Sequence, residues 1–266
     1  MKPFNPNVHQ AKKRFGQNFL QDEAIIERIV KSIRPAETDK LLEIGPGLGA
    51  LTKKLLAASG AISVIELDRD VTPKLKFNCD GLGELTIYEQ DALKTDYAAI
   101  ADGSKMRVVG NLPYNISTPI MFKLYDFLEN IHDMHFMLQK EVVERMVAKP
   151  GSKSFGRLSV MTQYACDAQM LFIVPPSAFI PAPKVDSAIV RLVPKVEPLT
   201  VKDFDLFNAV VSEAFNQRRK TVRNVWKKRM QADDFKALSI DPQLRPENLS
   251  LKEFINVANY LHQSEG

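Results

Sequence analysis

Short apolar runs alternate with amphipathic stretches through most of the chain before residue 140. The apolar runs that predict strands lie at 41–44, 62–67, 85–88, 107–109 and 135–138. The stretches between them place apolar residues on one helical face, as at 117–128. Ahead of the first strand, Asp22 can cap a helix that ends at Pro35. Strands that alternate with helices predict a parallel sheet covered by helices on both faces.

Two further strands, at 170–174 and 188–193, have no helical pattern between them. The segment that connects them, 175–183, is rich in proline, which removes backbone donors and prevents a helix. We therefore expect an antiparallel hairpin to close a mostly parallel, Rossmann-like α/β sheet.

The composition changes near 193–198, and the pattern beyond it is purely helical. The predicted helices cover 204–215, 218–230, 232–238 and 251–261. We therefore expect two domains, an α/β domain over residues 1–198 and a small all-helical domain over residues 199–266.

The composition is that of an ordinary globular protein, since 45% of the 266 residues are hydrophobic and 26% are charged. No apolar run is long enough for a transmembrane helix, and the N-terminus lacks the apolar core of a signal peptide. Cys79 and Cys166 lie too far apart for a CxxC knuckle, and His132 and His135 have no carboxylate or cysteine set beside them. We expect a cytoplasmic monomer without a membrane anchor or a metal.

The formal net charge of +4 is unevenly distributed. Residues 1–20 carry four basic residues and residues 217–230 carry seven, and neither segment contains an acid. A solvated helical face is the ordinary explanation of such a run, but the lack of acids within it favours phosphate binding. The residues that we expect to contact RNA are Lys12, Lys13, Arg14, Arg218, Arg219, Lys220 and Arg223.

A glycine-rich loop with Gly45, Gly47 and Gly49 lies between a predicted strand and a predicted helix. Glycine permits a sharp turn and a close approach of a ligand to the backbone, so this context indicates a nucleotide-type ligand rather than a plain turn. Glu66 ends the next strand, where an acid can bind both ribose hydroxyls. The loop alone does not distinguish NAD from S-adenosylmethionine.

The third and fourth strands are each followed by candidate chemistry. Asp91 could accept a hydrogen bond from an adenine amino group, although an Asp after a strand also serves as a cap or turn residue. The fourth strand ends in the tetrad Asn111-Leu112-Pro113-Tyr114. This tetrad can be a simple turn. It also has the N-x-P-Y form of enzymes that methylate an exocyclic amine on a base.

Amine methylation requires residues of these types. An adenine amino group is a poor nucleophile, because its lone pair is delocalised into the ring. Two acceptors, the Asn111 side-chain oxygen and a backbone carbonyl at Leu112 or Pro113, could favour a more pyramidal nitrogen. Pro113 fixes the backbone, and Tyr114 offers a ring for stacking. Catalysis would then consist of positioning and electrostatic preorganisation.

Six segments together make the chain resemble the KsgA family of ribosomal RNA adenine dimethyltransferases. They follow one another in the family's order and span almost the whole chain. They are Lys13–Leu20, Glu43–Gly49, Ile65–Asp68, Asn111–Ser117, Phe179–Ser187 and Phe215–Thr221. Val64 is a small departure, because a smaller residue is expected there.

The resemblance implies a class I methyltransferase that uses S-adenosylmethionine and forms N6,N6-dimethyladenosine in 16S rRNA. Two adjacent adenines near the 3′ end are each methylated twice in this family, on an assembly intermediate of the small ribosomal subunit. Carried over by position, Asn18 and Leu20 would close over the cofactor. Gly45 and Gly47 would admit its amino-acid end, and Glu66 would hold the ribose.

The remaining roles follow in the same way. Asp91 would bind the adenine amino group of the cofactor, and Asn111 would lie between the cofactor and the target. Tyr114 and Phe179 would sandwich the flipped target adenine.

Three other functions are compatible with parts of the pattern. A related resistance-type methyltransferase would modify large-subunit RNA, but Lys13–Gly16 and Phe215–Thr221 favour the small subunit. A non-catalytic RNA-binding assembly or transcription factor would not need the intact Glu66, Asp91 and tetrad. An NAD dehydrogenase would need a hydride-transfer constellation, which we do not recognise.

Overall fold

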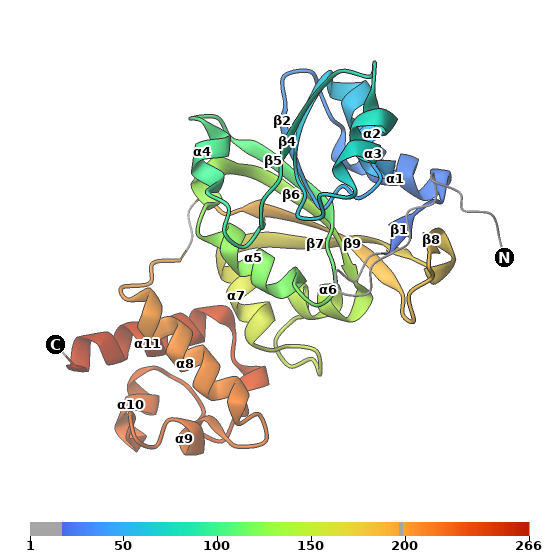
Figure 1. Ribbon diagram of the computed structural model, residues 1–266. Coiled ribbons are helices and arrows are strands. Elements are labelled where there is room, and N and C mark those ends of the chain that lie inside the picture. Colours follow the sequence, from blue (N-terminus) through green and yellow to red (C-terminus); the bar gives the residue numbers. More distant parts are fainter. Residues whose placement is uncertain (1–17, 197–198, 266) are drawn as a thin grey trace. The chain divides into compact units, whose positions relative to one another are not determined.

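The computed structural model describes residues 18–196 and 199–265, which form two compact units (Figure 1). The first unit contains the described residues up to Val143 together with Gln169–Pro194. The second contains Glu144–Ala168 and the described residues from Lys195 onward. Residues 144–168 therefore group with the C-terminal helices, whereas the sequence pattern placed them in the α/β domain. The domain boundary at 198/199 stays a prediction.

A seven-stranded sheet forms the centre of the first unit. Its strands run in the order β4-β3-β2-β5-β6-β9-β7. The pairs β2/β3, β3/β4, β2/β5 and β5/β6 are parallel, and β9 is antiparallel to β6, so the expected fold class is confirmed. The strands are β2 (Lys40–Ile44), β3 (Ala61–Ile65), β4 (Glu84–Tyr88), β5 (Met106–Asn111), β6 (Ile131–Gln139), β7 (Cys166–Val174) and β9 (Ser187–Pro194).

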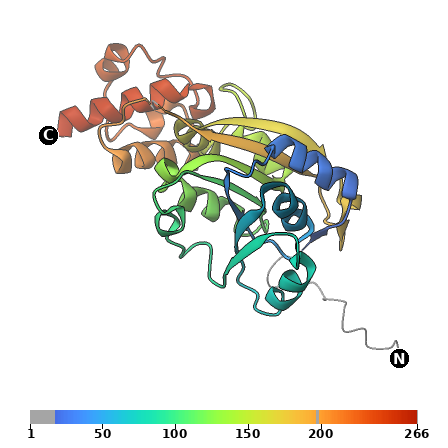
Figure 2. The same cartoon turned by 90° about the horizontal axis from the view of Figure 1, so that it is seen from above.

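Helices cover both faces of this sheet (Figure 2). One face carries α1 (Glu23–Ile33), α2 (Ala50–Ser59) and α3 (Thr72–Cys79), whose apolar residues join those of the strands in one buried cluster. The other face carries α4 (Tyr97–Ala101) and α5 (Ser117–Tyr125), and α5 is followed by a 3-10 turn at Leu128–Asn130. As expected, Asp22 caps α1, because its Oδ1 accepts a hydrogen bond from the Ile25 N–H at 3.1 Å.

A second, two-stranded sheet lies beside the main one. β1 (Phe19–Leu20) pairs antiparallel with β8 (Phe179–Ile180), and Leu20 lies opposite Phe179. The sequence pattern did not predict this pairing. The proline-rich segment ahead of β8 forms no α-helix, but it does contain a 3-10 turn at Pro176–Ala178.

The second unit is helical around a buried aromatic core that includes Phe207, Trp226 and Phe254. α6 (Lys140–Met146) leads from β6 into it, and the other helices are α7 (Arg157–Ala165), α8 (Phe204–Asn216), α9 (Val222–Val225), α10 (Ala232–Ala237) and α11 (Leu251–Glu265), with a 3-10 turn at Pro246–Asn248. No helix within 18–196 or 199–265 is long and apolar enough to span a bilayer.

The predicted helix over 218–230 is wrong. Only Val222–Val225 forms a helix there, with turns on either side. The N–H groups of Val222 and Arg223 donate to the carbonyls of Leu244 and Pro242 instead of to carbonyls one helical turn earlier. These bonds to a distant segment prevent a continuous helix through the basic run.

Candidate active site

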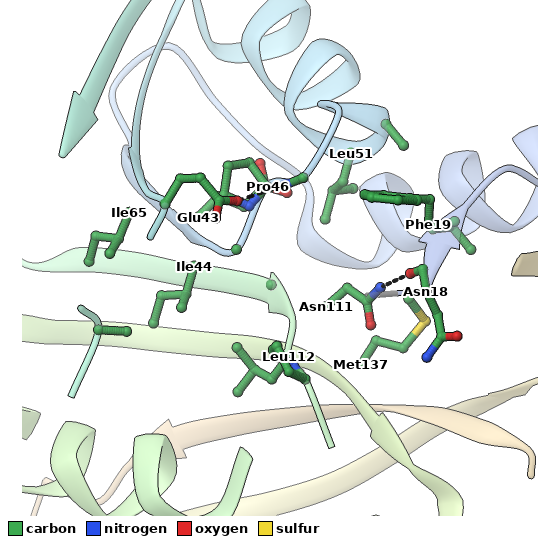
Figure 3. Close-up of a pocket in the computed structure, with 18 of the residues that line it drawn as sticks. Asn18, Phe19, Glu43, Ile44, Pro46, Leu51, Ile65, Asn111, Leu112 and Met137 are labelled. Atoms are coloured by element: carbon green, nitrogen blue, oxygen red, sulfur yellow. Dashed lines mark hydrogen bonds between the residues drawn. The ribbon is translucent and has the colours of Figure 1, made fainter. Parts of the chain in front are cut away.

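A cavity of about 510 Å³ lies at the carboxyl ends of β2, β3 and β5 in the first unit (Figure 3). In a parallel sheet these strand ends form the natural ligand crevice. The cavity gathers most of the residues that the sequence pattern singled out. Its lining includes Asn18, Leu20, Gly45, Gly47, Glu66, Asp91, Asn111, Leu112, Pro113 and Tyr114.

The glycine loop leaves room for a ligand beside its backbone. Gly45 and Gly47 have φ values of +68° and +56°, which side chains rarely adopt. A Cβ at Gly45 would meet only the Asn111 carbonyl oxygen within 4 Å, at 3.9 Å, so the space beside it is open. A Cβ at Gly47 would come within 3.2 Å of the Phe19 ring, which packs over the loop. The loop therefore fits a ligand that approaches the main chain closely.

Glu66 directs a fixed carboxylate toward the glycine loop. Its Oε1 accepts a hydrogen bond from the Asp68 N–H at 2.8 Å, and its Oε2 accepts one from the Gly47 N–H at 3.3 Å. The residue is 8% exposed, and this burial raises its pKa above the ordinary value. A carboxylate held in this way can accept hydrogen bonds from a pair of hydroxyls, such as those of a ribose.

Asp91 has both of the features that its sequence position suggested. Its Oδ1 accepts a hydrogen bond from the Leu93 N–H at 2.9 Å, which is a turn interaction, and the residue also lines the cavity. The turn therefore fixes the direction of a carboxyl group in the cavity lining.

Asn111 ends β5 and is linked to the segment at the start of the described chain. Its Nδ2 donates to the Asn18 carbonyl oxygen at 3.1 Å (Figure 3). We call residues 18–21 the cover segment, since all four line the cavity. The bond uses the amino end of the Asn111 amide and leaves its oxygen to face an N–H donor.

The rest of the tetrad is held by its neighbours. The Leu112 N–H donates to Met137 O at 3.2 Å, and the Pro113 carbonyl accepts from the Ile116 N–H at 3.1 Å. The Tyr114 hydroxyl lies 2.8 Å from Ser187 Oγ, and burial raises the pKa of this phenol. These contacts fix the backbone and the ring of the tetrad.

Phe179 does not line the cavity. It is 3% exposed and belongs to the buried apolar cluster, where its strand pairs with the cover segment. Its predicted role in base stacking stays a prediction.

The C-terminal basic segment is exposed but partly engaged. Arg218, Arg219, Lys220 and Arg223 are all exposed. Arg218 also donates to the carbonyls of Lys153 and Phe155, each at 3.0 Å. Arg229 forms an ion pair with Glu213 at 2.8 Å, so an acid does reach this segment from α8. Lys12, Lys13 and Arg14 lie outside the described residues.

Two buried polar residues of the cavity lining were missed at the level of sequence. Glu43 accepts a hydrogen bond from Thr52 Oγ1 at 2.6 Å, and burial raises its pKa to about 7. His135 borders the cavity from β6. In each case an ionisable residue within a predicted apolar run, 41–44 or 135–138, is the signal that could have identified it. Within 18–196 and 199–265 there is no cluster of three potential metal ligands among His, Cys, Asp and Glu side chains.

Two solved structures of similar fold are named as a dimethyladenosine transferase and an rRNA methyltransferase. A dimethyladenosine transferase from Plasmodium falciparum matches 93% of this chain and 98% of its own, with a TM-score of 0.77 and 27% identity. The 23S rRNA methyltransferase ErmE matches 92% of this chain and 100% of its own, with a TM-score of 0.75. Its identity of 23% supports the fold alone. The fold is therefore that of a class I, Rossmann-like methyltransferase.

Sequence comparison gives the family. The family model described as ribosomal RNA adenine dimethylase matches residues 8–263, and the chain belongs to this family. Proteins named ribosomal RNA small subunit methyltransferase A are similar over nearly their whole length. The relative from Hahella chejuensis is 52% identical over 97% of this chain and 96% of its own. The one from Pseudomonas aeruginosa is 53% identical over 97% of each.

Proposed function

We propose that this protein transfers methyl groups from S-adenosylmethionine to N6 of two adjacent adenines near the 3′ end of 16S rRNA. The product would be N6,N6-dimethyladenosine, formed on an assembly intermediate of the small ribosomal subunit. The observation that carries the proposal is that one cavity joins the glycine loop, Glu66 and the Asn111 tetrad. Family membership and the names of the relatives support the choice of RNA.

The residues of the cavity fit a nucleoside-type cofactor with an amino-acid tail. Gly45 and Gly47 would admit the amino-acid end, and Glu66 would hold the ribose. Asp91 would accept from the adenine amino group, and Asn18 with Leu20 would cover the bound molecule. S-adenosylmethionine supplies, when bound, an already activated sulfonium methyl group.

The tetrad would position the target amine. The Asn111 oxygen accepts from one N–H of the adenine amino group, and a backbone carbonyl accepts from the other. Sequence alone allowed the carbonyl of Leu112 or that of Pro113. Because Pro113 already accepts from Ile116, we assign the second acceptor to Leu112. In each transfer the amine nitrogen would form its bond to the methyl carbon as the carbon–sulfur bond breaks, S-adenosylhomocysteine would leave, and the proton of the amine would pass to water.

The target base would be held from the side of β8 and β9. Tyr114 supplies one ring, fixed by Ser187, and Phe179 supplies the other from the strand beside the cover segment. The exposed Arg219, Lys220 and Arg223 would bind the RNA backbone without reading its sequence, so selectivity would come from RNA shape and the flipped base.

The decisive experiment is methyl transfer from labelled S-adenosylmethionine to undermethylated small subunits, large subunits or free RNA, followed by mapping of the labelled base. We expect label on two adjacent adenines of 16S rRNA. Asn111→Ala should lower turnover by roughly 100-fold or more, because a preorganised acceptor is removed. Its unfolding midpoint should change little, so that the loss is one of transfer and not of folding.

Three results would contradict parts of this proposal. Label confined to large subunits would indicate the resistance-type activity. Cofactor binding without transfer to any RNA would indicate a non-catalytic assembly factor. Near-normal turnover by Asn111→Ala would show that the amine is not positioned as we describe.

A further inference from the structure

Two large apolar side chains are exposed at β8 and in the short segment that follows it. Ile180 is 59% exposed and Val185 is 46% exposed. We call these two residues the apolar rim. Pro181 and Pro183 lie between them, and each proline fixes its own backbone, so the segment is stiff. Single exposed apolar residues are common, but two on one stiffened segment need an explanation.

The pairing of β1 with β8 sets the direction of Ile180. The two strands lie side by side (Figure 1), and Ile180 is directly opposite Phe19. Residues opposite each other in an antiparallel pair project from the same face. The Phe19 ring packs over Gly47 and lines the cavity. Ile180 therefore projects on the cavity side of the small sheet.

The same pairing brings Ile180 close to the residue that would position the amine. Asn18 directly precedes Phe19, and its carbonyl accepts from Asn111 Nδ2 at 3.1 Å. Neighbouring strands lie about 4.8 Å apart, so Ile180 is about one strand spacing from the cover segment that contacts Asn111. A base held at Asn111 would therefore have Ile180 at the edge of its site.

The other end of the segment is tied to the tetrad. Val185 precedes Ser187 by two residues, and Ser187 Oγ lies 2.8 Å from the Tyr114 hydroxyl. The Asp186 carbonyl between them accepts from the Lys140 N–H at 2.9 Å. The segment that carries the rim therefore runs from the cover segment to the tetrad, and both of these line the cavity.

The charge of this segment suits RNA. Lys184 is exposed directly beside Val185. The acid that follows, Asp186, is partly buried, and Lys140 Nζ lies 3.8 Å from its Oδ2, which offsets its charge. The segment therefore offers apolar surface together with a cation, which complement the face of a base and a phosphate. An apolar patch on a protein partner would match the two large residues but would not need the cation.

We propose that the apolar rim packs against the RNA base next to the flipped adenine. A base that leaves its stack uncovers the face of its neighbour, and some proteins that kink nucleic acids fill such a gap with apolar side chains. Ile180 and Val185 would replace the lost stacking partner and stabilise the flipped state of the RNA. They are positioning residues, since they touch neither the cofactor nor the reacting amine. The inference rests on the proposed function.

The test measures flipping and methyl transfer separately. Small subunits are reconstituted with 16S rRNA that carries 2-aminopurine at one target position, a base that fluoresces when it leaves the stack and has no N6 amine to methylate. Single-turnover methyl transfer is measured in parallel with saturating undermethylated subunits. We expect Ile180→Ser combined with Val185→Ser to lower the transfer rate about tenfold and the rise in fluorescence at least about twofold. The affinity for S-adenosylhomocysteine, measured by calorimetry, should not change.

Two further variants serve as controls. Ile180→Leu combined with Val185→Leu keeps apolar surface at both positions and should retain the wild-type rate and fluorescence within about twofold. Ile173→Ser is the matched control, because Ile173 on β7 is 42% exposed and does not line the cavity, and it should change neither signal. The unfolding midpoints of all these variants should match that of the wild type, because the replaced side chains are exposed.

Four results would overturn the inference. They are an unchanged transfer rate or fluorescence in the double serine variant, a lower unfolding midpoint of that variant, a loss confined to the binding of subunits, and no fluorescence rise with the wild type. The third result would indicate an apolar contact with a ribosomal protein. In each case the proposed function stands if the wild type transfers methyl groups to 16S rRNA. If the wild type transfers none to any RNA, the proposed function and this inference fail together.

Discussion

Glu43 is a buried carboxyl group in the lining of the cavity. It is 2% exposed, lies two positions before the glycine loop and accepts a hydrogen bond from Thr52. Burial is the largest cause that raises its pKa from 4.5 to about 7, the Thr52 bond opposes this, and the charge of Glu66 adds to it. Between about pH 4.5 and pH 7 the native state therefore holds a proton here that the unfolded chain has largely released.

This difference makes the effect of Glu43→Gln depend on pH. The folded pKa lies above the unfolded one, so the associated stability is complete below pH 4.5 and disappears as pH rises through about 7. Gln does not titrate and mimics the protonated acid. The free energy of unfolding, measured in urea, should therefore rise for the variant relative to the wild type between pH 4.5 and pH 8, by up to about 3 kcal/mol.

The exposed Glu84 on β4 gives the control, because Glu84→Gln removes a carboxylate from the surface of the same sheet. A pH dependence of the same size for both variants, or a difference for Glu43→Gln that stays constant with pH, would contradict the account of Glu43.

At the scale of elements, the spacing of β2 and β5 depends on a single missing side chain. Gly110 lies in β5 directly before Asn111, and a Cβ there would stand 2.5 Å from the Ile44 carbonyl oxygen of β2. The neighbouring atom belongs to the backbone, which cannot rotate away. The parallel pairing that carries both the glycine loop and Asn111 therefore requires glycine at this position.

We predict that Gly110→Ala lowers the free energy of unfolding by about 2–4 kcal/mol, because the strands must separate or bend. Gly156→Ala is the matched control: its backbone is extended and no atom lies within 4 Å of the added Cβ. Chemical denaturation of both variants would test the prediction, and equal stability of the two would show that the sheet adjusts at little cost.

At the scale of the whole molecule, exposed positive charge is concentrated in one segment of the second unit, although the net charge is small. The net charge is only +4, yet Arg219, Lys220 and Arg223 are all exposed within one short stretch that contains no acid. Arg218 and Arg229 are partly engaged by the second unit itself, so the three others are the better candidates for binding phosphates.

Replacement of these three residues by Glu should weaken RNA binding. The slope of log affinity against log salt concentration should become shallower by about 0.7–0.9 for each phosphate that the protein no longer neutralises. Cofactor affinity should not change. The control reverses three exposed lysines elsewhere in the second unit, Lys202, Lys236 and Lys252. If both triple variants change the slope equally, the effect is one of net charge and the segment has no special role.

Much of the first unit could be predicted because its signals are local. Apolar runs, the Asp22 cap and the glycine loop each act within a few residues, and the structure has all three. The tetrad was found in the same way, since its residues are consecutive.

Features that depend on distant partners could not be predicted. The β1–β8 pairing joins segments about 160 residues apart, and the N–H groups of Val222 and Arg223 bond to residues 242–244. His135 resembles an ordinary strand residue until the register places it against the cavity. Propensity and periodicity carry no information on such pairings.

The bond between Asn111 Nδ2 and the Asn18 carbonyl has a consequence for the polarity of the site. A side-chain amide is nearly symmetric in shape, so rotation by half a turn would exchange its oxygen and nitrogen and present a donor in place of an acceptor. A backbone carbonyl can only accept, and it therefore selects one of the two orientations. Because every amino acid has that carbonyl, a substitution at position 18 that keeps the backbone in place leaves the selected orientation unchanged.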